Sequence, residues 1–371
     1  MVFGTRPEAI KMAPLVLALR SQPKVFQVIV CVTGQHREML DQVLEIFSII
    51  PDIDLDLMKQ NQTMGDLTAS ILLKISDILK ETKPDLVLVH GDTTTTFATS
   101  LGCFYQGIQV GHVEAGLRTG NLHSPFPEEF NRQAVSRIAE LHFAPTETCK
   151  LNLLQEGINP EKIFVTGNTV IDALLWILSR IENEPELRKE IIGELDRILN
   201  FDWQSKRFVL VTGHRRENFG DGFQEICLAL SDLSEKYPNI EFVYPVHLNP
   251  NVQEPVFKTL GERKNISLVD PMDYLTFSML LQKCFFVLTD SGGIQEEAPS
   301  LGKPVLLMRD TTERPEGVLA GTTKLVGANR EQIVISASLL IEDEMAFQRM
   351  STSVNPYGSG KSVDAILKGI S

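Results

Sequence analysis

Short apolar runs alternate with longer amphipathic segments along most of the chain. The runs are rich in Val, Leu, Ile and Phe, which is typical of buried strands. Between them, segments such as 128–140 (EEFNRQAVSRIAE) and 222–237 (GFQEICLALSDLSEKY) place apolar residues at helical spacing. The pattern predicts β-α-β units and parallel sheets. The predicted strands lie in 85–92, 109–116, 141–146 and 163–168 of the first half and in 207–214, 240–247, 285–290 and 303–310 of the second.

The two halves repeat one arrangement. Residues 2–8 (VFGTRPE) and 211–217 (VTGHRRE) both end a predicted strand with Gly-x-Arg-x-Glu, and 90–96 (HGDTTTT) and 289–295 (TDSGGIQ) both follow a strand with Asp and then Thr or Ser. We therefore expect an α/β protein with two doubly wound, Rossmann-like domains that face each other across a central cleft. In open α/β sheets, ligands bind beyond the carboxyl ends of the strands, where these loops lie, so the cleft is the expected site.

The boundary between the domains is predicted in a charged segment that is poor in strand-forming residues. This segment, 171–204, is expected to form linking helices. It separates an N-terminal Rossmann-like domain at 1–170 from a second Rossmann-like domain at 205–355.

Composition narrows the classes of function. A chain of 371 residues with 43% hydrophobic composition can build two cores. The net charge of −13 gives no general attraction to nucleic acid or anionic membrane, so a bound anion must be held by a few local cations. Five scattered cysteines form no C-x-x-C pair, which favours reduced thiols and a cytoplasmic protein. No apolar stretch approaches the ~18 residues of a membrane span, so neither membrane insertion nor a nucleic-acid partner is expected.

A glycine pair between a predicted strand and a predicted helix marks the first candidate site. Gly292 and Gly293 allow a ligand to approach the backbone closely, and with Ser291 they would present helix N–H groups to a diphosphate. Glu297, with Glu296 as second choice, could accept hydrogen bonds from a ribose diol. The alternative is a helix start with glycines for packing. A strict G-x-G-x-x-G is missing, which argues against a nicotinamide or flavin cofactor.

Three cations follow predicted strands and could contact the same anion. Arg6 and Lys11 lie in a second strand-to-helix turn, and Arg314 follows another strand. The guanidinium fork suits phosphate. The alternative is that these are ordinary surface cations.

An acidic set of residues occupies the first half. Asp92 and Glu114 each end a strand, and Glu128 and Arg132 are spaced i, i+4 at the start of a helix. Each alone could be a cap or a salt bridge, but several carboxylates at one sheet edge can carry out proton transfer. His214, from the second half, could act as acid, base or phosphate donor.

Other motifs favour structural explanations. His90 and His112 lie in or beside buried strands and are predicted to be structural rather than metal ligands, and no metal site is expected. The D-x-D of 52–57 (DIDLDL) is better explained as a half-exposed strand, and no G-x-S-x-G of a serine hydrolase is present.

Taken together, the motifs resemble those of the non-hydrolysing UDP-N-acetylglucosamine 2-epimerases, in the same order from residue 2 to about residue 327. The motifs are FGTRPEAIKMAPL, GQHREML, HGDTTT, HVEAGLRT, PEEFNR, TGNTVID, TGHRREN, DSGGIQEEAP and RPEG. The resemblance implies a glycosyltransferase-B type fold, with a C-terminal helix at 356–371 returning to the first domain. It also implies reversible conversion of UDP-GlcNAc to UDP-ManNAc for cell-surface polysaccharide, without cofactor or essential metal, in a homodimer.

The resemblance also implies roles for individual residues. Asp92, Glu114, Glu128 and His214 match catalytic positions. Phosphate, sugar or ribose contacts are implied for Arg6, Lys11, Arg132, Ser291, Gly292, Gly293, Glu297 and Arg314.

Two further features of the family bear on this chain. Many bacterial members bind a second UDP-GlcNAc as an activator, and Gln35 and His247 match that pattern, whereas Glu38 and Asn61 depart from it. A carboxylate beside a diphosphate is repulsive, so weaker or altered activation is expected. Members also carry several more residues before FGTRP, so we expect the first strand of this chain to be shortened.

Three alternative activities share these motifs. A hydrolysing relative would release free ManNAc and UDP. An epimerase of a modified UDP-uronic acid would use another sugar nucleotide, and a glycosyltransferase would leave C2 unchanged.

Overall fold

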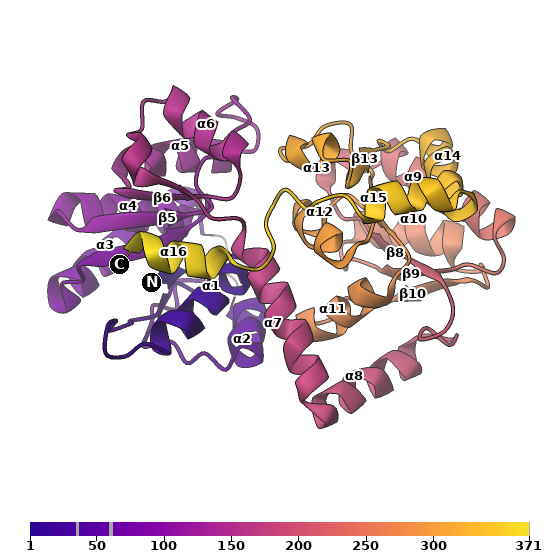
Figure 1. The fold of residues 1–371 in the computed structure, drawn as a ribbon, viewed down its shortest axis with the longest axis horizontal. Helices are drawn as coiled ribbons and strands as arrows, with labels where there is room; N and C mark the ends of the chain where they lie inside the picture. The colour runs from indigo at the N-terminus through magenta and orange to yellow at the C-terminus, as the bar shows by residue number, and fades with distance from the viewer. Residues whose placement is uncertain (35–36, 59–61, 371) are drawn as a thin grey trace. The chain divides into compact units, whose positions relative to one another are not determined.

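The computed structural model describes residues 1–34, 37–58 and 62–370. Within it the chain divides into two compact units, one made of Met1–Ala173 with Tyr357–Ser371 and the other of Leu174–Pro356. The division falls inside helix α7 (Thr169–Asn183), which begins in unit 1 and ends in unit 2. Unit 1 includes the indigo to magenta elements and the yellow C-terminal helix of Figure 1.

Unit 1 is built on parallel strands in two hydrogen-bonded groups. Four strands pair in the order β4-β5-β6-β7, three pair in the order β1-β2-β3, and β1 packs beside β4. The strand order therefore reverses at β1 and β4, as in doubly wound sheets. The strands are β1 (Val2–Phe3), β2 (Cys31–Val32), β3 (Ile53–Asp54), β4 (Leu86–His90), β5 (Gln109–Val113), β6 (Leu141–Ala144) and β7 (Ile163–Val165).

Several helices of unit 1 begin at a threonine that caps them. Thr5 caps α1, Thr63 caps α3 and Thr93 caps α4, each through its side-chain oxygen. The last helix, α16, returns to unit 1 and packs against α1 and β7 (Figure 1). The helices are α1 (Arg6–Arg20), α2 (Arg37–Ile46), α3 (Met64–Thr82), α4 (Thr94–Gln106), α5 (Glu128–Ile138), α6 (Glu147–Gln155), the 3₁₀ helix η1 (Pro160–Lys162) and α16 (Ser362–Ile370).

Unit 2 holds a six-stranded parallel sheet in the order β10-β9-β8-β11-β12-β13. The chain order reverses between β8 and β11, so the loops that follow these two strands lie at the switch point where such sheets bind ligands. The strands are β8 (Phe208–Thr212), β9 (Glu241–Pro245), β10 (Ile266–Val269), β11 (Val287–Thr289), β12 (Val305–Leu307) and β13 (Thr323–Leu325).

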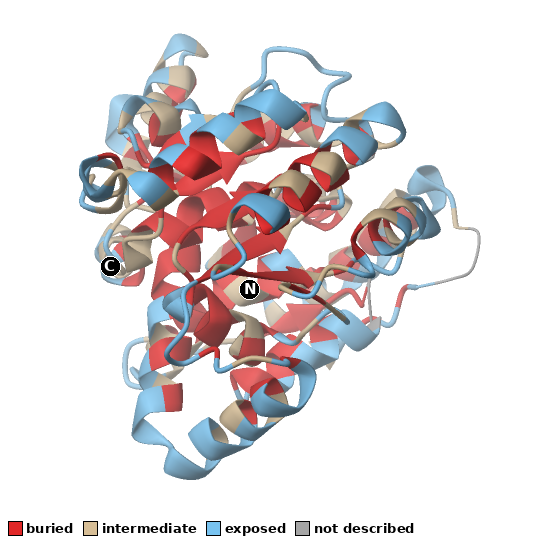
Figure 2. Cartoon of the chain, turned by 90° about the vertical axis from the view of Figure 1, so that its right-hand side faces the viewer, coloured by how far each residue is buried: buried red, intermediate tan, exposed pale blue. Residues whose placement is uncertain are grey.

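The central strands β8, β9, β11 and β12 of this sheet are mostly buried. Figure 2 draws buried residues in red. Apolar side chains from α9, β8 and β9 form the main core of unit 2, for example Phe223, Val211 and Phe242. The helices are α8 (Pro185–Ile198), η2 (Arg216–Asn218), α9 (Asp221–Lys236), α10 (Pro250–Leu260), α11 (Tyr274–Lys283), α12 (Gly292–Glu297), η3 (Ala298–Leu301), α13 (Pro315–Leu319), α14 (Arg330–Glu342) and α15 (Glu344–Ser351).

The predicted α/β class with parallel, doubly wound sheets is confirmed. All eight predicted strands are present, and 52–57 contains the short strand β3. The central cleft stays a prediction. Across residues 1–34, 37–58 and 62–370, no helix combines the length and the apolar character that a membrane span requires.

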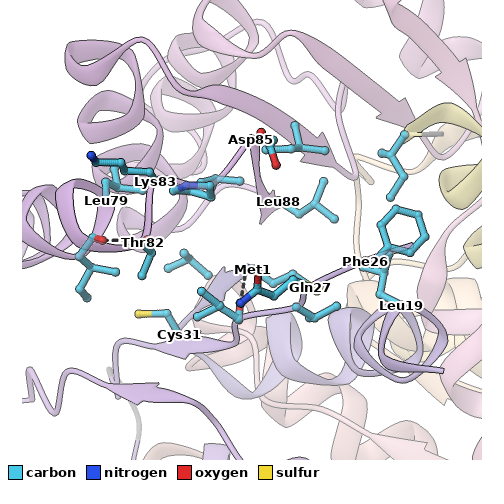
Figure 3. Close-up of a pocket in the computed structure, with 18 of the residues that line it drawn as sticks. Met1, Leu19, Phe26, Gln27, Cys31, Leu79, Thr82, Lys83, Asp85 and Leu88 are labelled. Atoms are coloured by element: carbon cyan, nitrogen blue, oxygen red, sulfur yellow. Dashed lines mark hydrogen bonds between the residues drawn. The ribbon is translucent and has the colours of Figure 1, made fainter. Parts of the chain in front are cut away.

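A cavity of about 420 Å³ opens in unit 1 between the amino ends of β1, β2 and β4. Figure 3 shows Met1 and Cys31 on one side of it and Leu79, Lys83 and Leu88 on the other. Ligands of doubly wound sheets bind at the opposite, carboxyl edge, so this cavity is not the candidate active site.

Candidate active site

In unit 1, Asp92 and Arg132 form an ion pair beyond the carboxyl end of β4. The Arg132 guanidinium donates to Oδ2 of Asp92, and the Asn131 amide donates to the Asp92 carbonyl at 2.8 Å. The Arg132 side chain is 6% exposed, whereas 25% of the Asp92 side chain remains accessible. Asp92 is thus held by its neighbours and can still meet a ligand.

The surroundings of Asp92 favour its protonated form. Burial raises the pKa of Asp92, and the nearby Glu114 carboxylate raises it further. Arg132 and Lys11 oppose this rise because their positive charges stabilise the carboxylate. A carboxyl group with a raised pKa is suited to giving and taking a proton near neutral pH.

Glu114 lies directly after β5 with a φ of 65°, in the left-handed region that non-glycine residues seldom adopt. Lys11 from α1 forms a buried ion pair with its Oε2 atom, and the Asn168 amide donates to the same oxygen at 2.6 Å. His90 Nε2 lies 3.8 Å from Oε2. Backbone strain of this kind concentrates at functional sites, and here the Lys11 and Asn168 side chains hold the strained residue in place.

Arg132 has a second buried partner, Glu129, at 3.2 Å. Burial raises the pKa of Glu129, but hydrogen bonds from Gln133 and the Thr119 and Gly120 amides, with the Arg132 charge, lower it overall. Glu128, the residue chosen from the sequence, is partly exposed at the start of α5, and its Oε2 atom has no hydrogen-bond partner among the described residues. Glu129 therefore fixes Arg132, and Glu128 keeps an oxygen for a ligand.

Glu8 joins the loop that carries Arg6 to the loop that carries Asp92. Its Oε2 atom accepts the Gly4 and Thr5 amides at 3.0 and 2.8 Å, and its Oε1 atom accepts the Thr93 hydroxyl at 2.6 Å. Glu8 is 2% exposed. The capping box of α1 is thus also the brace between the two loops. Arg6 lies at the first residue of α1 and is partly exposed.

The buried histidines of unit 1 have structural surroundings. His112 Nε2 lies 2.7 Å from the Gly91 carbonyl, and burial lowers its pKa to about 3. Burial also lowers the pKa of His90 to about 4. Within the described part of the chain, no group of three or more His, Cys, Asp or Glu side chains is arranged for a metal ion.

In unit 2, Asp290 organises the switch point of the sheet. It follows β11 directly and is fully buried. Its Oδ2 atom accepts the backbone N–H groups of His214 and Arg215 at 2.9 and 2.8 Å, which ties the loop after β8 to the loop after β11. His214 Nδ1 lies 3.5 Å from Oδ1 of Asp290, and 43% of the His214 side chain is exposed.

Ser291 and Gly292 begin α12, and Arg314 lies directly against them. A Cβ atom on Gly292 would be 2.7 Å from Nη1 of Arg314, so only glycine allows the guanidinium this close to the helix start. Gly293 faces more open space, since its nearest atom, an oxygen of Glu297, is 3.9 Å from the position of a Cβ. The Ser291 side chain makes no capping hydrogen bond.

Carboxylates hold Arg314 in position. Its Nε atom donates to Glu296 at 2.6 Å and its Nη1 atom donates to Glu313 at 2.7 Å. Burial raises the pKa of Glu313, but Arg314, Arg309 and Arg215 lower it overall to about 2. Glu297 is buried, and its Oε1 atom accepts the Tyr274 hydroxyl at 2.6 Å.

Of the four residues compared with the activator pattern, the structure describes His247 in unit 2 and Glu38 in unit 1. The exposed ring of His247 stacks on that of His214, with centroids 5.6 Å apart. Glu38 is exposed in α2. Gln35 and Asn61 lie outside the described residues.

A family model for UDP-N-acetylglucosamine 2-epimerase matches residues 18–371. The chain belongs to the UDP-N-acetylglucosamine 2-epimerase family. The UDP-N-acetylglucosamine 2-epimerase of Escherichia coli is 57% identical over 369 residues, covering 100% of this chain and 97% of the relative. The resemblance inferred from the motifs is therefore confirmed.

Solved structures agree with this epimerase assignment. The UDP-GlcNAc 2-epimerase of Neisseria meningitidis, in its UDP-GlcNAc complex, superposes with a TM-score of 0.92 at 51% identity and covers 100% of this chain and 98% of its own. A glycosyltransferase from Rickettsia africae is 13% identical and has a TM-score of 0.60, with 99% and 96% coverage. That second likeness concerns the fold alone and supports the glycosyltransferase-B type architecture.

Sequence reasoning missed several residues that shape this epimerase site. Asn168, Glu129 and Asp290 each lie within a motif, yet only their contacts show what they do. Glu313 is a similar case, since its arginine partners come from three separate positions. A signal was available for Asp290, because a carboxylate directly after a strand at a switch point faces the neighbouring loop.

Proposed function

We propose that this protein converts UDP-GlcNAc to UDP-ManNAc reversibly. One observation supports it most: beyond β4 and β5, the carboxylates of Asp92 and Glu114 lie close together, each paired with a cation, in a chain of this family. Such a set can move a proton and bind an anionic substrate at once.

The chemistry of the substrate explains why an indirect route is needed. The C2 proton of the sugar is not next to a carbonyl, so it is not acidic enough for direct removal. In the proposed route a carboxylate takes the C2 proton, the C2–H electrons form the C1–C2 double bond, and UDP leaves C1 with its bonding electrons. This elimination gives 2-acetamidoglucal and UDP as intermediates. UDP then adds back to C1 while a proton arrives on the opposite face of C2, which gives UDP-ManNAc.

We assign the proton transfers to Asp92, Glu114 and Glu128. The raised pKa of Asp92 suits a group that must take and return a proton, and Glu114 is held by Lys11 and Asn168. Glu128 has an oxygen without a hydrogen-bond partner in the described structure, which could accept from the sugar. Each general acid or base contributes roughly 10²–10⁴-fold.

The departing diphosphate needs positive charge and N–H donors. We assign Ser291, Gly292 and Gly293 to the diphosphate and Glu297 to the ribose, because the start of α12 presents its backbone and Glu297 is close behind. Arg314, which packs on Gly292, and His214 would stabilise the charge on UDP as it leaves. Arg6, Lys11 and Arg132 are proposed to contact phosphate or sugar.

No cofactor is proposed, because elimination and re-addition of UDP leave the oxidation state of the sugar unchanged.

We propose a homodimer, in keeping with exposed apolar side chains on α3 and α4, where Leu73, Phe104 and Tyr105 are 69%, 62% and 68% exposed. All five cysteines are free rather than disulfide-bonded, which supports a role in the cytoplasm. The product would supply cell-surface polysaccharide, and activation by UDP-GlcNAc is proposed to be weak because Glu38 departs from the pattern.

Product analysis separates this function from its alternatives. Purified protein incubated with UDP-GlcNAc should form UDP-ManNAc without an acceptor, and Asp92→Asn and Glu114→Gln should each lose at least about 10²-fold in kcat. Free ManNAc with UDP would identify a hydrolysing enzyme. Turnover of a UDP-uronic acid alone would identify a modified substrate, and turnover only with an acceptor would identify a glycosyltransferase.

A further inference from the structure

We propose that Asp290 is a positioning residue that fixes the tautomer and the charge of His214. The proposal rests on the proposed function only in giving His214 a role in the reaction. Asp290 itself is fully buried and lies beneath the loop that carries His214.

The hydrogen bonds of Asp290 leave one oxygen for the histidine. Its Oδ2 atom accepts the amides of His214 and Arg215 and, at 3.3 Å, the side chain of Asn218, so the carboxylate cannot rotate freely. Its Oδ1 atom is buried without a hydrogen-bond partner in the described part of the chain. The ring nitrogen Nδ1 of His214 is 3.5 Å from that atom. A small closure of the loop would make a hydrogen bond, as catalytic contacts often do when substrate binds.

The charged groups around His214 show why this carboxylate matters. Desolvation by the surrounding protein lowers the pKa of His214, and Arg215 on its own loop and His247 on the loop after β9 lower it further. Asp290, from the loop after β11, is the group that raises it. If Asp290 were neutral, the imidazolium form of His214 would have only Arg215 and His247 as charged or titratable neighbours, and neither stabilises a positive charge.

The chemical consequence concerns the other ring nitrogen. When Nδ1–H donates to Asp290, Nε2 is left to exchange a proton with the substrate or donate to the departing diphosphate. An imidazolium formed there would be stabilised by the buried carboxylate. A histidine oriented by a third, buried acid is a general arrangement for proton transfer.

A double-mutant cycle tests whether Asp290 acts through His214. Asp290→Asn should lower kcat by about 10- to 10³-fold in the wild-type background and by less than about threefold in His214→Ala, with KM little changed in both. In the Asp290→Asn single variant, the limb of the kcat–pH profile that reports titration of His214 should move to lower pH. The reason is that Asp290, the group that raises the pKa of His214, has lost its charge. Equal losses in both backgrounds would overturn the proposal.

Asn218→Ala provides a matched control. It removes a donor to Oδ2 of Asp290 and leaves Oδ1 and its charge in place. We expect kcat to stay within about threefold of wild type. A loss as large as that of Asp290→Asn would mean that bracing of the loop explains both variants, and would overturn the proposal.

A measurement on the wild-type protein needs no stable variant. Nitrogen-15 NMR of labelled histidines, with His214 assigned by the signal missing in His214→Gln, should show neutral His214 protonated on Nδ1. Protonation on Nε2 would overturn the proposal. This readout does not depend on turnover, so an inactive protein with the Nδ1 tautomer would contradict the proposed function alone, whereas an active one with the Nε2 tautomer would contradict only the role of Asp290.

Discussion

Asn168 donates its side-chain amide to Oε2 of Glu114 at 2.6 Å, while its own backbone N–H donates to the Tyr357 carbonyl at 2.7 Å. Asn168 is 2% exposed, and its Oδ1 atom accepts the Val170 amide. The C-terminal segment that returns to unit 1 therefore helps to position a proposed catalytic carboxylate.

We predict that Asn168→Ala lowers kcat by about 10- to 100-fold with little change in KM, because Glu114 loses the donor that fixes its oxygen. Asn168→Asp should be at least as harmful, since a second carboxylate would repel Glu114. Steady-state kinetics measure both. Asn159→Ala, which removes an exposed cap of η1, is the control and should keep full activity. Normal kcat in Asn168→Ala would show that the contact is not needed.

Lys11→Met should move the acid limb of the pH profile upwards. Burial raises the pKa of Asp92 and the Lys11 charge opposes this rise, so removing Lys11 lets that pKa rise further. An Asp92 base must be deprotonated, and activity should therefore fall at a higher pH than in wild type. Profiles of kcat/KM against pH measure the limb. A limb that stays in place, or moves to lower pH, would rule out Asp92 as the group observed.

Gly292→Ala should weaken UDP binding by about tenfold while the fold remains intact. The new methyl group would meet Nη1 of Arg314, which Glu296 and Glu313 hold in place, so the guanidinium must leave the start of α12. Isothermal titration with UDP measures the affinity. Gly193→Ala, where an added Cβ meets nothing within 4 Å, is the matched control. Equal affinity in both variants would contradict the assignment of Arg314 to the diphosphate.

Glu313 should contribute stability that depends on pH. Its pKa falls from 4.5 to about 2 in the folded protein, so the contribution is present above pH 4.5 and lost as the pH falls towards 2. The shift corresponds to about 3 kcal/mol. Urea unfolding should show Glu313→Gln destabilised at pH 7 by up to this amount, with the difference shrinking below pH 4.5.

The exposed Glu262 offers a control for that experiment, and Glu262→Gln should stay within about 0.5 kcal/mol of wild type at every pH. A Glu313→Gln difference that is the same at pH 7 and pH 3 would mean that lost packing, not charge, explains it.

The α/β class and most of the strands could be predicted from the sequence. Continuous apolar runs such as 85–92 and 207–214 identify β4 and β8, because a strand buried on both faces of a parallel sheet is apolar at nearly every position. The short strands β2, β10 and β13 were missed. β10 and β13 are the edge strands of their sheet, and Ser267 and Lys324 interrupt their apolar residues, so neither forms a continuous apolar run.

The sequence predicted which loops carry the site, but not the contacts that their side chains make. Asp92 and Glu114 were found because they end strands at the carboxyl edge. The partner of Arg132 within α5 is Glu129, at i, i+3, and not Glu128, at i, i+4. Both spacings allow a contact on a helix, so the sequence does not choose between them. The brace made by Glu8 is likewise visible only in three dimensions, since Thr93 is distant in sequence.

The most direct test follows the C2 hydrogen of the sugar. Purified protein should be incubated with UDP-GlcNAc in D₂O and the C2 and anomeric signals followed by NMR. The proposed elimination predicts UDP-ManNAc with deuterium at C2. UDP-ManNAc that keeps its original hydrogen, or UDP-GlcNAc that remains unchanged, would contradict it.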